Sequence, residues 1–173
     1  MKLLKYLFIT KNLFITKNLF ITKNLFMRNY NLIDNTKKSI EEVITSDYRI
    51  QNIESLIVYE SRIKKHAKIF KNIINKERLP IDIYGLRIIY DIPNSDNYTN
   101  MNYIGYNILD IIHKNFEIYN NNEVDDYIKF PKENGYKSLH TNIYYQKCIF
   151  EIQIRDIYMH YHTLYGNSSN YHK

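Results

Sequence analysis

The chain contains one cysteine, four glycines, three prolines and no tryptophan among its 173 residues. The lone cysteine, Cys148, excludes an internal disulfide framework and a cysteine-rich zinc site. With 45% hydrophobic residues, the chain can bury one well-formed core, but its length leaves little room for two. The composition therefore predicts a single folded domain with an extension.

Acidic residues are absent from the first 30 positions, although this stretch carries six basic side chains. These are Lys2, Lys5, Lys11, Lys17, Lys23 and Arg28. The formal net charge of the whole chain is +6, so the remaining positions balance 18 basic against 18 acidic side chains. The rest of the chain is therefore not a general polyanion-binding surface, and any phosphate-binding lysines in it must be clustered.

The same stretch repeats the sequence Leu-Phe-Ile-Thr-Lys-Asn from Leu7, Leu13 and Leu19. A lysine in every copy leaves no apolar run long enough to span a membrane. Three short copies are also too few for a self-supporting solenoid. We expect residues 1–34 to form a low-complexity tail, either disordered or used for targeting, and residues 35–173 to form the folded domain. The expected location is the cytoplasm, or an organelle if the tail is a targeting segment.

Beyond the tail, apolar periodicity predicts alternating helices and strands. Ser39 and Glu42 have capping-box spacing and indicate a helix that begins near Asn35. Six further elements follow in the order strand, helix, strand, helix, strand and strand. We expect them over residues 56–59, 62–76, 86–90, 103–116, 141–145 and 148–154.

In the last predicted strand, alternation sends the apolar side chains to one face and three polar side chains to the other. The polar side chains are Glu151, Gln153 and Arg155. They form either the floor of a site or a solvated face of an antiparallel sheet.

Basic residues gather where the first predicted strand meets the next helix. Arg62 and Lys64 precede the apolar helical pattern, and Lys65, Lys68 and Lys71 lie off its apolar face. Free backbone N–H groups and the helix dipole attract phosphate at such a position. The junction is therefore a candidate anion site, and the alternative is an ordinary solvated helix face.

Further residues have the chemistry needed to hold and attack a polyphosphate. Asp82 precedes a buried strand, where it could bind a magnesium ion between nucleotide phosphates or cap a turn. The motif Asp126-Tyr-Ile-Lys-Phe-Pro-Lys-Glu-Asn-Gly-Tyr-Lys-Ser-Leu-His-Thr141 combines lysines with aromatic rings. Glu151-Ile-Gln-Ile-Arg155 follows and supplies a lone carboxylate.

These motifs resemble, in order and spacing, the synthetase domain of the RelA/SpoT family over about residues 55–166. The resemblance also includes Arg62-x-Lys64, Asp82-x-x-x-x-Arg87 and Met159-His160. It implies an α+β fold of the nucleotidyltransferase type, related to polymerase β, with a mixed five-stranded sheet flanked by helices. It further implies that pyrophosphate passes from ATP to the 3′-hydroxyl of GDP or GTP with Mg²⁺, forming ppGpp or pppGpp in stringent-response signalling.

The resemblance also implies a role for each matching position. Glu151 would be the general base and would share the metal with Asp82. The ATP-binding residues would be Arg62, Lys64, Lys68, Lys71 and Arg87. The acceptor nucleotide would contact Tyr136, which would stack on the guanine, together with Lys132, Asn134, His140, Gln153 and Arg155.

The chain departs from the family pattern at several positions. Lys68 stands where a serine is usual, and Asn72 stands where a lysine is usual, so the ATP side has lost one cation. Leu164 replaces a usual glutamate, and Asn170 replaces a usual histidine. The segment Glu123-Val-Asp125-Asp126 resembles the acidic variant found in members that have only synthetase activity.

Three hypotheses about function follow. The first is an active ppGpp synthetase of the small alarmone synthetase kind. The second is a catalytically weak nucleotide- or RNA-binding module whose ATP side has eroded at Lys68 and Asn72. The third is pyrophosphorylation of the tRNA 3′ end, with RNA held in part by the basic tail. The oligomeric state is not predicted by the sequence.

Overall fold

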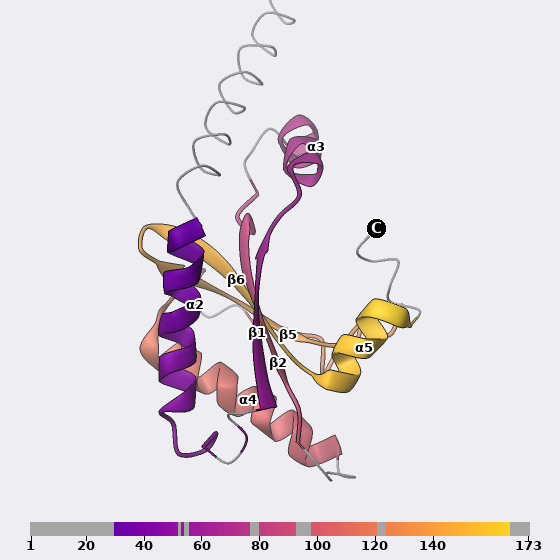
Figure 1. The fold of residues 1–173 in the computed structure, drawn as a ribbon. Helices are drawn as coiled ribbons and strands as arrows, with labels where there is room; N and C mark the ends of the chain where they lie inside the picture. The colour runs from indigo at the N-terminus through magenta and orange to yellow at the C-terminus, as the bar shows by residue number, and fades with distance from the viewer. Residues whose placement is uncertain are drawn as a thin grey trace, which may run out of the picture.

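The computed structural model describes residues 30–51, 53, 56–76, 80–92, 98–120 and 124–166. Most of the predicted tail, with its possible contact to RNA, lies outside these residues. The elements are α2 (Tyr30–Thr45), β1 (Ile57–Ile63), α3 (His66–Lys76), β2 (Tyr84–Tyr90), α4 (Tyr98–Asn115), β3 (Glu117–Ile118), β4 (Val124–Asp126), β5 (Leu139–Tyr145), β6 (Cys148–Asp156) and α5 (Ile157–Tyr165) (Figure 1). No helix in the described part of the chain is both long and apolar enough to cross a membrane.

The strands form one mixed sheet in the order β1-β2-β6-β5-β3, with β4 also paired to β5. Strands β2 and β6 are parallel, and the other pairs are antiparallel. The predicted mixed sheet is therefore confirmed, but within the described residues it has six strands rather than five. The sequence did not indicate β3 and β4 because two or three residues are too few to display an alternating pattern.

Helices α2 and α4 pack on one face of the sheet and enclose the main hydrophobic core (Figure 1). Ile40 and Ile44 of α2 and Ile108 and Ile112 of α4 belong to this core, and all four side chains are fully buried. Burial of such side chains contributes about 1.5–3 kcal/mol each. This core holds the sheet on which the polar residues are arranged.

Helix α2 begins at Tyr30, so the prediction of a helix start near Asn35 was wrong. Ile33 is buried at 4% exposure and continues the apolar face of the helix toward the N-terminus. The predicted capping residue Ser39 lies inside the helix, where its hydroxyl pairs with that of Tyr145 at 3.0 Å. The core contact of Ile33 outweighs a capping pattern that is worth about 1 kcal/mol.

The opposite face of β6 is polar but covered. Ile152 and Ile154 enter the hydrophobic core, while Gln153 and Arg155 are 5% and 0% exposed on the other side. The alternative of a solvated sheet face is therefore wrong. Helix α5 follows β6 directly, because Asp156 caps it by accepting a hydrogen bond from the backbone N–H of Met159 at 2.7 Å.

Candidate active site

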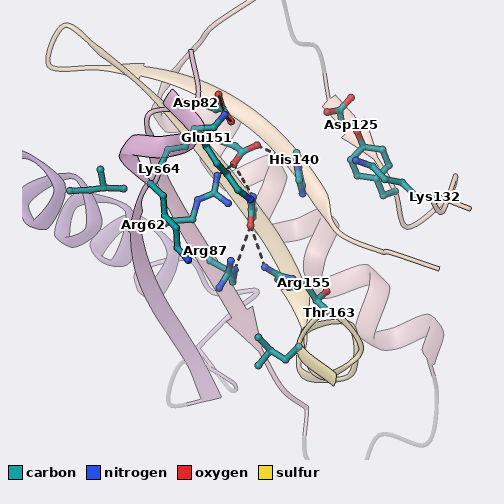
Figure 2. Close-up of a pocket in the computed structure, with 16 residues that line it drawn as sticks. Arg62, Lys64, Asp82, Arg87, Asp125, Lys132, His140, Glu151, Arg155 and Thr163 are labelled. Atoms are coloured by element: carbon teal, nitrogen blue, oxygen red, sulfur yellow. Dashed lines mark hydrogen bonds and ion pairs between the residues drawn. The ribbon is translucent and has the colours of Figure 1, made fainter. Parts of the chain in front are cut away.

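A cavity of about 650 Å³ opens over the polar face of the sheet, between α3, α5 and the β4–β5 segment (Figure 2). Seven cationic and three acidic side chains line it. The cationic side chains are Arg62, Lys64, Lys65, Lys68, Arg87, Lys132 and Arg155, and the acidic ones are Asp82, Asp125 and Glu151. Because the cations outnumber the acids, the cavity attracts an anionic ligand.

Strand register creates the first row of the cavity floor. Arg62 of β1 lies opposite Gly85 of β2, and Gly85 lies opposite Glu151 of β6. Since Gly85 has no side chain, the Arg62 guanidinium reaches across β2, and its Nη2 donates to Oε2 of Glu151 at 3.1 Å. A small residue at position 85 therefore leaves room for this pair, which joins two strands that are not neighbours.

The next row of the floor follows from the same register. Arg87, Gln153 and His140 of the cavity lining occupy neighbouring positions on β2, β6 and β5. Glu60 of β1 lies opposite Arg87, outside the lining. Arg87 donates from Nη1 to Oε2 of Glu60 at 2.7 Å and from Nε to Oε1 of Gln153 at 3.4 Å. Glu60 and Gln153 thus hold the Arg87 guanidinium in place from the two strands that flank β2.

Glu151 is the most constrained carboxylate in the described part of the cavity. Its Oε2 accepts hydrogen bonds from Arg62 and from Nε2 of Gln153 at 2.8 Å, and its Oε1 lies 3.5 Å from Nδ1 of His140. Burial by itself would raise the pKa of Glu151. The hydrogen bond and charge of His140, the charge of Arg62 and the Gln153 hydrogen bond outweigh burial and lower the pKa to about 2.

This low pKa predicts a loss of stability in acid. The contribution of the Glu151 interactions is fully present above about pH 4.3, the ordinary glutamate pKa, and is lost as the pH falls toward the lowered value. We expect the wild type to lose thermal stability relative to Glu151→Gln as the pH falls from about 7 to about 3. Thermal unfolding of both proteins across this range measures the difference, and a pH-independent difference would contradict the prediction.

Asp82 supplies a second carboxylate to the cavity lining. Both of its oxygens accept hydrogen bonds from Nζ of Lys64, at 2.8 and 2.6 Å. Lys64 follows β1 and is held by its backbone N–H, which donates to the carbonyl of Ile83 at 2.9 Å. Lys64 and Asp82 therefore face each other at the end of the β1–β2 strand pair, close to Glu151 (Figure 2).

These carboxylates do not form a preformed metal cage. Among the described residues, no group of three or more His, Cys, Asp or Glu side chains could hold a metal ion. Magnesium usually binds one or two carboxylates together with the phosphates of a substrate. Asp82 and Glu151 are carboxylates of the kind that such an ion binds.

An aromatic wall, formed by Tyr127 and His140, lies across the cavity from Arg62 and Arg87, near Asp125 and Lys132 (Figure 2). Tyr127 lines the cavity, and Nζ of Lys132 lies 4.3 Å from the centre of its ring. His140 packs edge-on against Tyr127 with ring centres 5.3 Å apart. A planar base and a phosphate could both be held here, by the ring and the cation.

Tyr136 lies behind this wall, which differs from the prediction that its ring is available for stacking. Its side chain is 1% exposed, and its hydroxyl pairs with Nε2 of His140 at 2.8 Å. The ring packs edge-on against Tyr127 and His140. Tyr127 is therefore the tyrosine on the cavity surface, and stacking of Tyr136 on a base stays a prediction that requires its ring to be uncovered.

Two other predicted residues do not line the cavity. Oδ1 of Asn134 accepts a hydrogen bond from the backbone N–H of Tyr136 at 3.1 Å, which shapes a turn in which Gly135 has a φ of 77°. Lys71 is exposed on α3, outside the cavity lining. The cavity does bring together the other predicted residues, Arg62, Lys64, Lys68, Asp82, Arg87, Lys132, His140, Glu151, Gln153 and Arg155.

Several lining residues were missed by sequence reasoning. Asp125 directly precedes the long motif and Tyr127 is its second residue, so their positions in the sequence were a usable signal. Thr163 had no such signal, because α5 is short and only its return toward the sheet brings this residue to the cavity. Leu164 was noted only as a departure from the family pattern. Lys65 belonged to the predicted basic junction and was not assigned a role.

Comparison with known sequences identifies relatives of this domain. A family described as "Region found in RelA / SpoT proteins" matches residues 61–172. "Probable guanosine-3′,5′-bis(diphosphate) 3′-pyrophosphohydrolase" of Mycoplasma pneumoniae is 31% identical over 79% of this chain and 17% of its own length. "Probable GTP diphosphokinase RSH2, chloroplastic" of Oryza sativa is 37% identical over 52% of this chain and 11% of its own length. The chain spans 11–17% of the length of the curated relatives it matches.

Comparison with solved structures establishes the fold. Small alarmone synthetase 1 from Bacillus subtilis, in a crystal structure bound to its product pppGpp, superimposes with a TM-score of 0.59. The match covers 87% of this chain and 82% of the other at 21% identity. The predicted α+β, nucleotidyltransferase-like fold is therefore confirmed.

Proposed function

Because the chain belongs to the RelA/SpoT family, we propose that it is a synthetase that transfers pyrophosphate from ATP to the 3′-hydroxyl of GDP or GTP. The observation that carries this proposal is the cavity itself, in which a partly buried carboxylate, Glu151, lies among cationic side chains that outnumber the acidic ones. Polyphosphate transfer requires positioning and neutralisation of charge more than covalent chemistry. The cavity supplies both.

The donor end of the cavity is the junction of β1 and α3. Arg62, Lys64, Lys65 and Lys68 line the cavity there, and α3 begins beside them at His66, where the helix dipole favours phosphate. We assign the ATP phosphates to this end. The loss of a cation at Asn72 is offset by Lys68, which has replaced the family's serine.

The acceptor end lies at the β4–β5 segment. Tyr127, Lys132 and His140 provide a ring face, a cation and a hydrogen-bonding ring in the cavity lining. We assign the guanine nucleotide to this end, with its 3′-hydroxyl directed toward Glu151. His140 connects the acceptor end to the base, since its ring contacts both Tyr136 and Glu151.

In the reaction, the 3′-oxygen of the acceptor attacks the β-phosphorus of ATP and forms a new P–O bond. The bond from that phosphorus to the oxygen bridging the α- and β-phosphates breaks, and AMP leaves. The Glu151 carboxylate accepts the hydroxyl proton. Magnesium held by Asp82 and Glu151 would neutralise charge on the phosphates.

Glu151 is a weak base while Arg62 and His140 hold its pKa near 2. Phosphate oxygens of ATP compete with Glu151 for the Arg62 guanidinium. Loss of that contact raises the pKa of Glu151 toward the range in which a carboxylate accepts a proton efficiently. The donor nucleotide therefore contributes to activation of the base.

Product formation tests the proposal. Purified protein is incubated with magnesium and labelled ATP, and GDP, GTP or tRNA is offered separately. Guanosine 3′-pyrophosphate products support the synthetase, whereas label found on tRNA alone would show that tRNA, not GDP or GTP, is the acceptor. Binding of nucleotide by folded protein without transfer to any acceptor would leave only a binding module.

The two lysines of α3 form a matched pair for testing the donor end. We expect Lys68→Met to raise the KM for ATP about fivefold, corresponding to roughly 1 kcal/mol for an exposed ion pair. Lys71→Met should stay within about twofold, because Lys71 is exposed outside the cavity lining. Steady-state kinetics at low ionic strength compares them, and equal effects would contradict the assignment.

Gly85 offers a second test of the floor. A Cβ at position 85 would lie 3.5 Å from Nε of Arg62, which is an ordinary contact, so Gly85→Ala should be tolerated. Gly85→Leu fills the path between Arg62 and Glu151, and overpacking of this kind costs about 1–3 kcal/mol. We expect Gly85→Leu to be less stable than Gly85→Ala by about that amount, measured by thermal unfolding. Leucine and alanine variants of the same stability would refute the role of the open path.

A further inference from the structure

Three alternate residues of β6 form a chain of hydrogen bonds along its polar face. Nη2 of Arg155 donates to Oε1 of Gln153 at 3.2 Å, and Nε2 of Gln153 donates to Oε2 of Glu151 at 2.8 Å. Arginine only donates and an ionised carboxylate only accepts, so one orientation of the amide satisfies both neighbours. The reversed amide would place its oxygen against the carboxylate.

Arg155 is better placed than Arg87 to hold the Gln153 oxygen. Arg87 lies 3.4 Å from that oxygen and is engaged by Glu60 at 2.7 Å. Arg155 is 0% exposed and starts from the same strand face as Gln153. A ligand in the cavity can draw Arg87 away more readily than it can move a fully buried side chain.

Stability does not account for a buried arginine at this position. Nε and Nη1 of Arg155 are buried without a hydrogen-bond partner in the described structure. Burial, with the nearby positive charge of Arg87, lowers the pKa of Arg155 to about 10. The positive charge of Arg155 is partly compensated by the ring of Tyr136, whose centre lies 6.0 Å from the guanidinium carbon. A buried charge that is only partly paired costs folding free energy.

We propose that Arg155 is a positioning residue that sets the orientation of the Gln153 amide and thereby aims the Glu151 carboxylate. The proposal deepens the function proposed above and rests on it, since Glu151 is the base of that reaction. It assigns to Arg155 and Gln153 an action on the base, in place of the direct contact with the acceptor nucleotide that the sequence predicted.

The kinetic test is a double-mutant cycle with Arg155→Met and Gln153→Ala. Arg155→Met should lower kcat about tenfold, the order expected for loss of one hydrogen bond involving a charged group, with KM nearly unchanged. In the Gln153→Ala background the same change should have an effect of less than about twofold, because the amide is no longer there to be oriented. Independent, additive effects, or a change confined to KM, would overturn the proposal.

Two controls separate positioning from folding. Arg155→Lys keeps a donor and should restore most of kcat, and it remains informative if Arg155→Met fails to fold. The midpoint of thermal unfolding should stay constant or rise in Arg155→Met, since removing a partly paired buried charge is often neutral or stabilising. Arg49→Met makes the same chemical change outside the cavity, where Arg49 pairs with Asp47 and Asp110, and should lower the midpoint with little change in kcat.

A measurement independent of activity distinguishes failure of this proposal from failure of the proposed function. The chain has three glutamines, Gln51, Gln146 and Gln153, and the first two are exposed. With ¹⁵N-labelled glutamine side chains, the amide signal lost in Gln153→Ala identifies Gln153. Its protons should exchange slowly with water in the wild type and rapidly in Arg155→Met.

Unchanged exchange in Arg155→Met would overturn the proposal even if the enzyme is active. Faster exchange in a protein that makes no product would support control of the amide by Arg155 and would reject the synthetase function. The two failures thus give different results.

Discussion

Glu151→Gln is expected to lower kcat for pyrophosphate transfer about thousandfold, within the range lost with a general base. Glutamine has nearly the same size and can still accept a hydrogen bond from Arg62, but it cannot take the proton of the 3′-hydroxyl. The affinity for ATP should stay constant or increase slightly, because Arg62 is no longer held by a carboxylate charge. Product formation and calorimetric binding measure the two effects separately.

Glu60→Gln is the matched control for this prediction. Glu60 pairs with Arg87 in the neighbouring row, and its side chain is 44% exposed and outside the cavity lining. We expect its kcat to stay within about fivefold of the wild type, as for loss of an exposed ion pair. If the Glu151 variant were as active as the Glu60 variant, another group would have to be the base.

The second large effect is expected for Asp82→Asn, which should lower kcat about a hundredfold at a fixed magnesium concentration. The asparagine can still accept a hydrogen bond from Lys64, so the lysine keeps its position. What is lost is a negative oxygen ligand for a hard cation. Initial rates at increasing magnesium should therefore recover part of the activity of the variant.

Asp110→Asn makes the same change at a surface ion pair with Arg49 and Lys114, away from the cavity. Its dependence on magnesium should match that of the wild type. An Asp82→Asn variant with wild-type magnesium dependence and reduced ATP affinity would show that Asp82 acts by holding Lys64 rather than by binding the metal.

Some of the fold follows from local patterns. The alternation in residues 148–154 predicted that Glu151, Gln153 and Arg155 share a face, and the structure confirms it because side chains on any strand alternate. Helical periodicity in residues 103–116 also predicted α4, and the short apolar run 86–90 predicted β2. The start of α2 was missed, since a local capping signal competes with a core contact that the sequence does not display.

The sequence predicted which residues form the candidate site better than it predicted how they are arranged. Most residues drawn from the motifs line one cavity, but Tyr136 is covered and Tyr127 takes the surface position. Sequence reasoning also could not tell Lys68 from Lys71, because both lie off the apolar face of α3. Which of them faces the cavity depends on how α3 is set against the sheet.

The sequence by itself determined the class of the fold, the chemical types gathered in the motifs and the face of β6 that is polar. These properties depend on periodicity and residue type, which are local. The tertiary structure alone decided that Arg62 crosses Gly85 to reach Glu151 and that Arg155 is buried behind Gln153. Such contacts depend on strand register and on the return of α5 over the sheet, and both are set by the packing of the whole core.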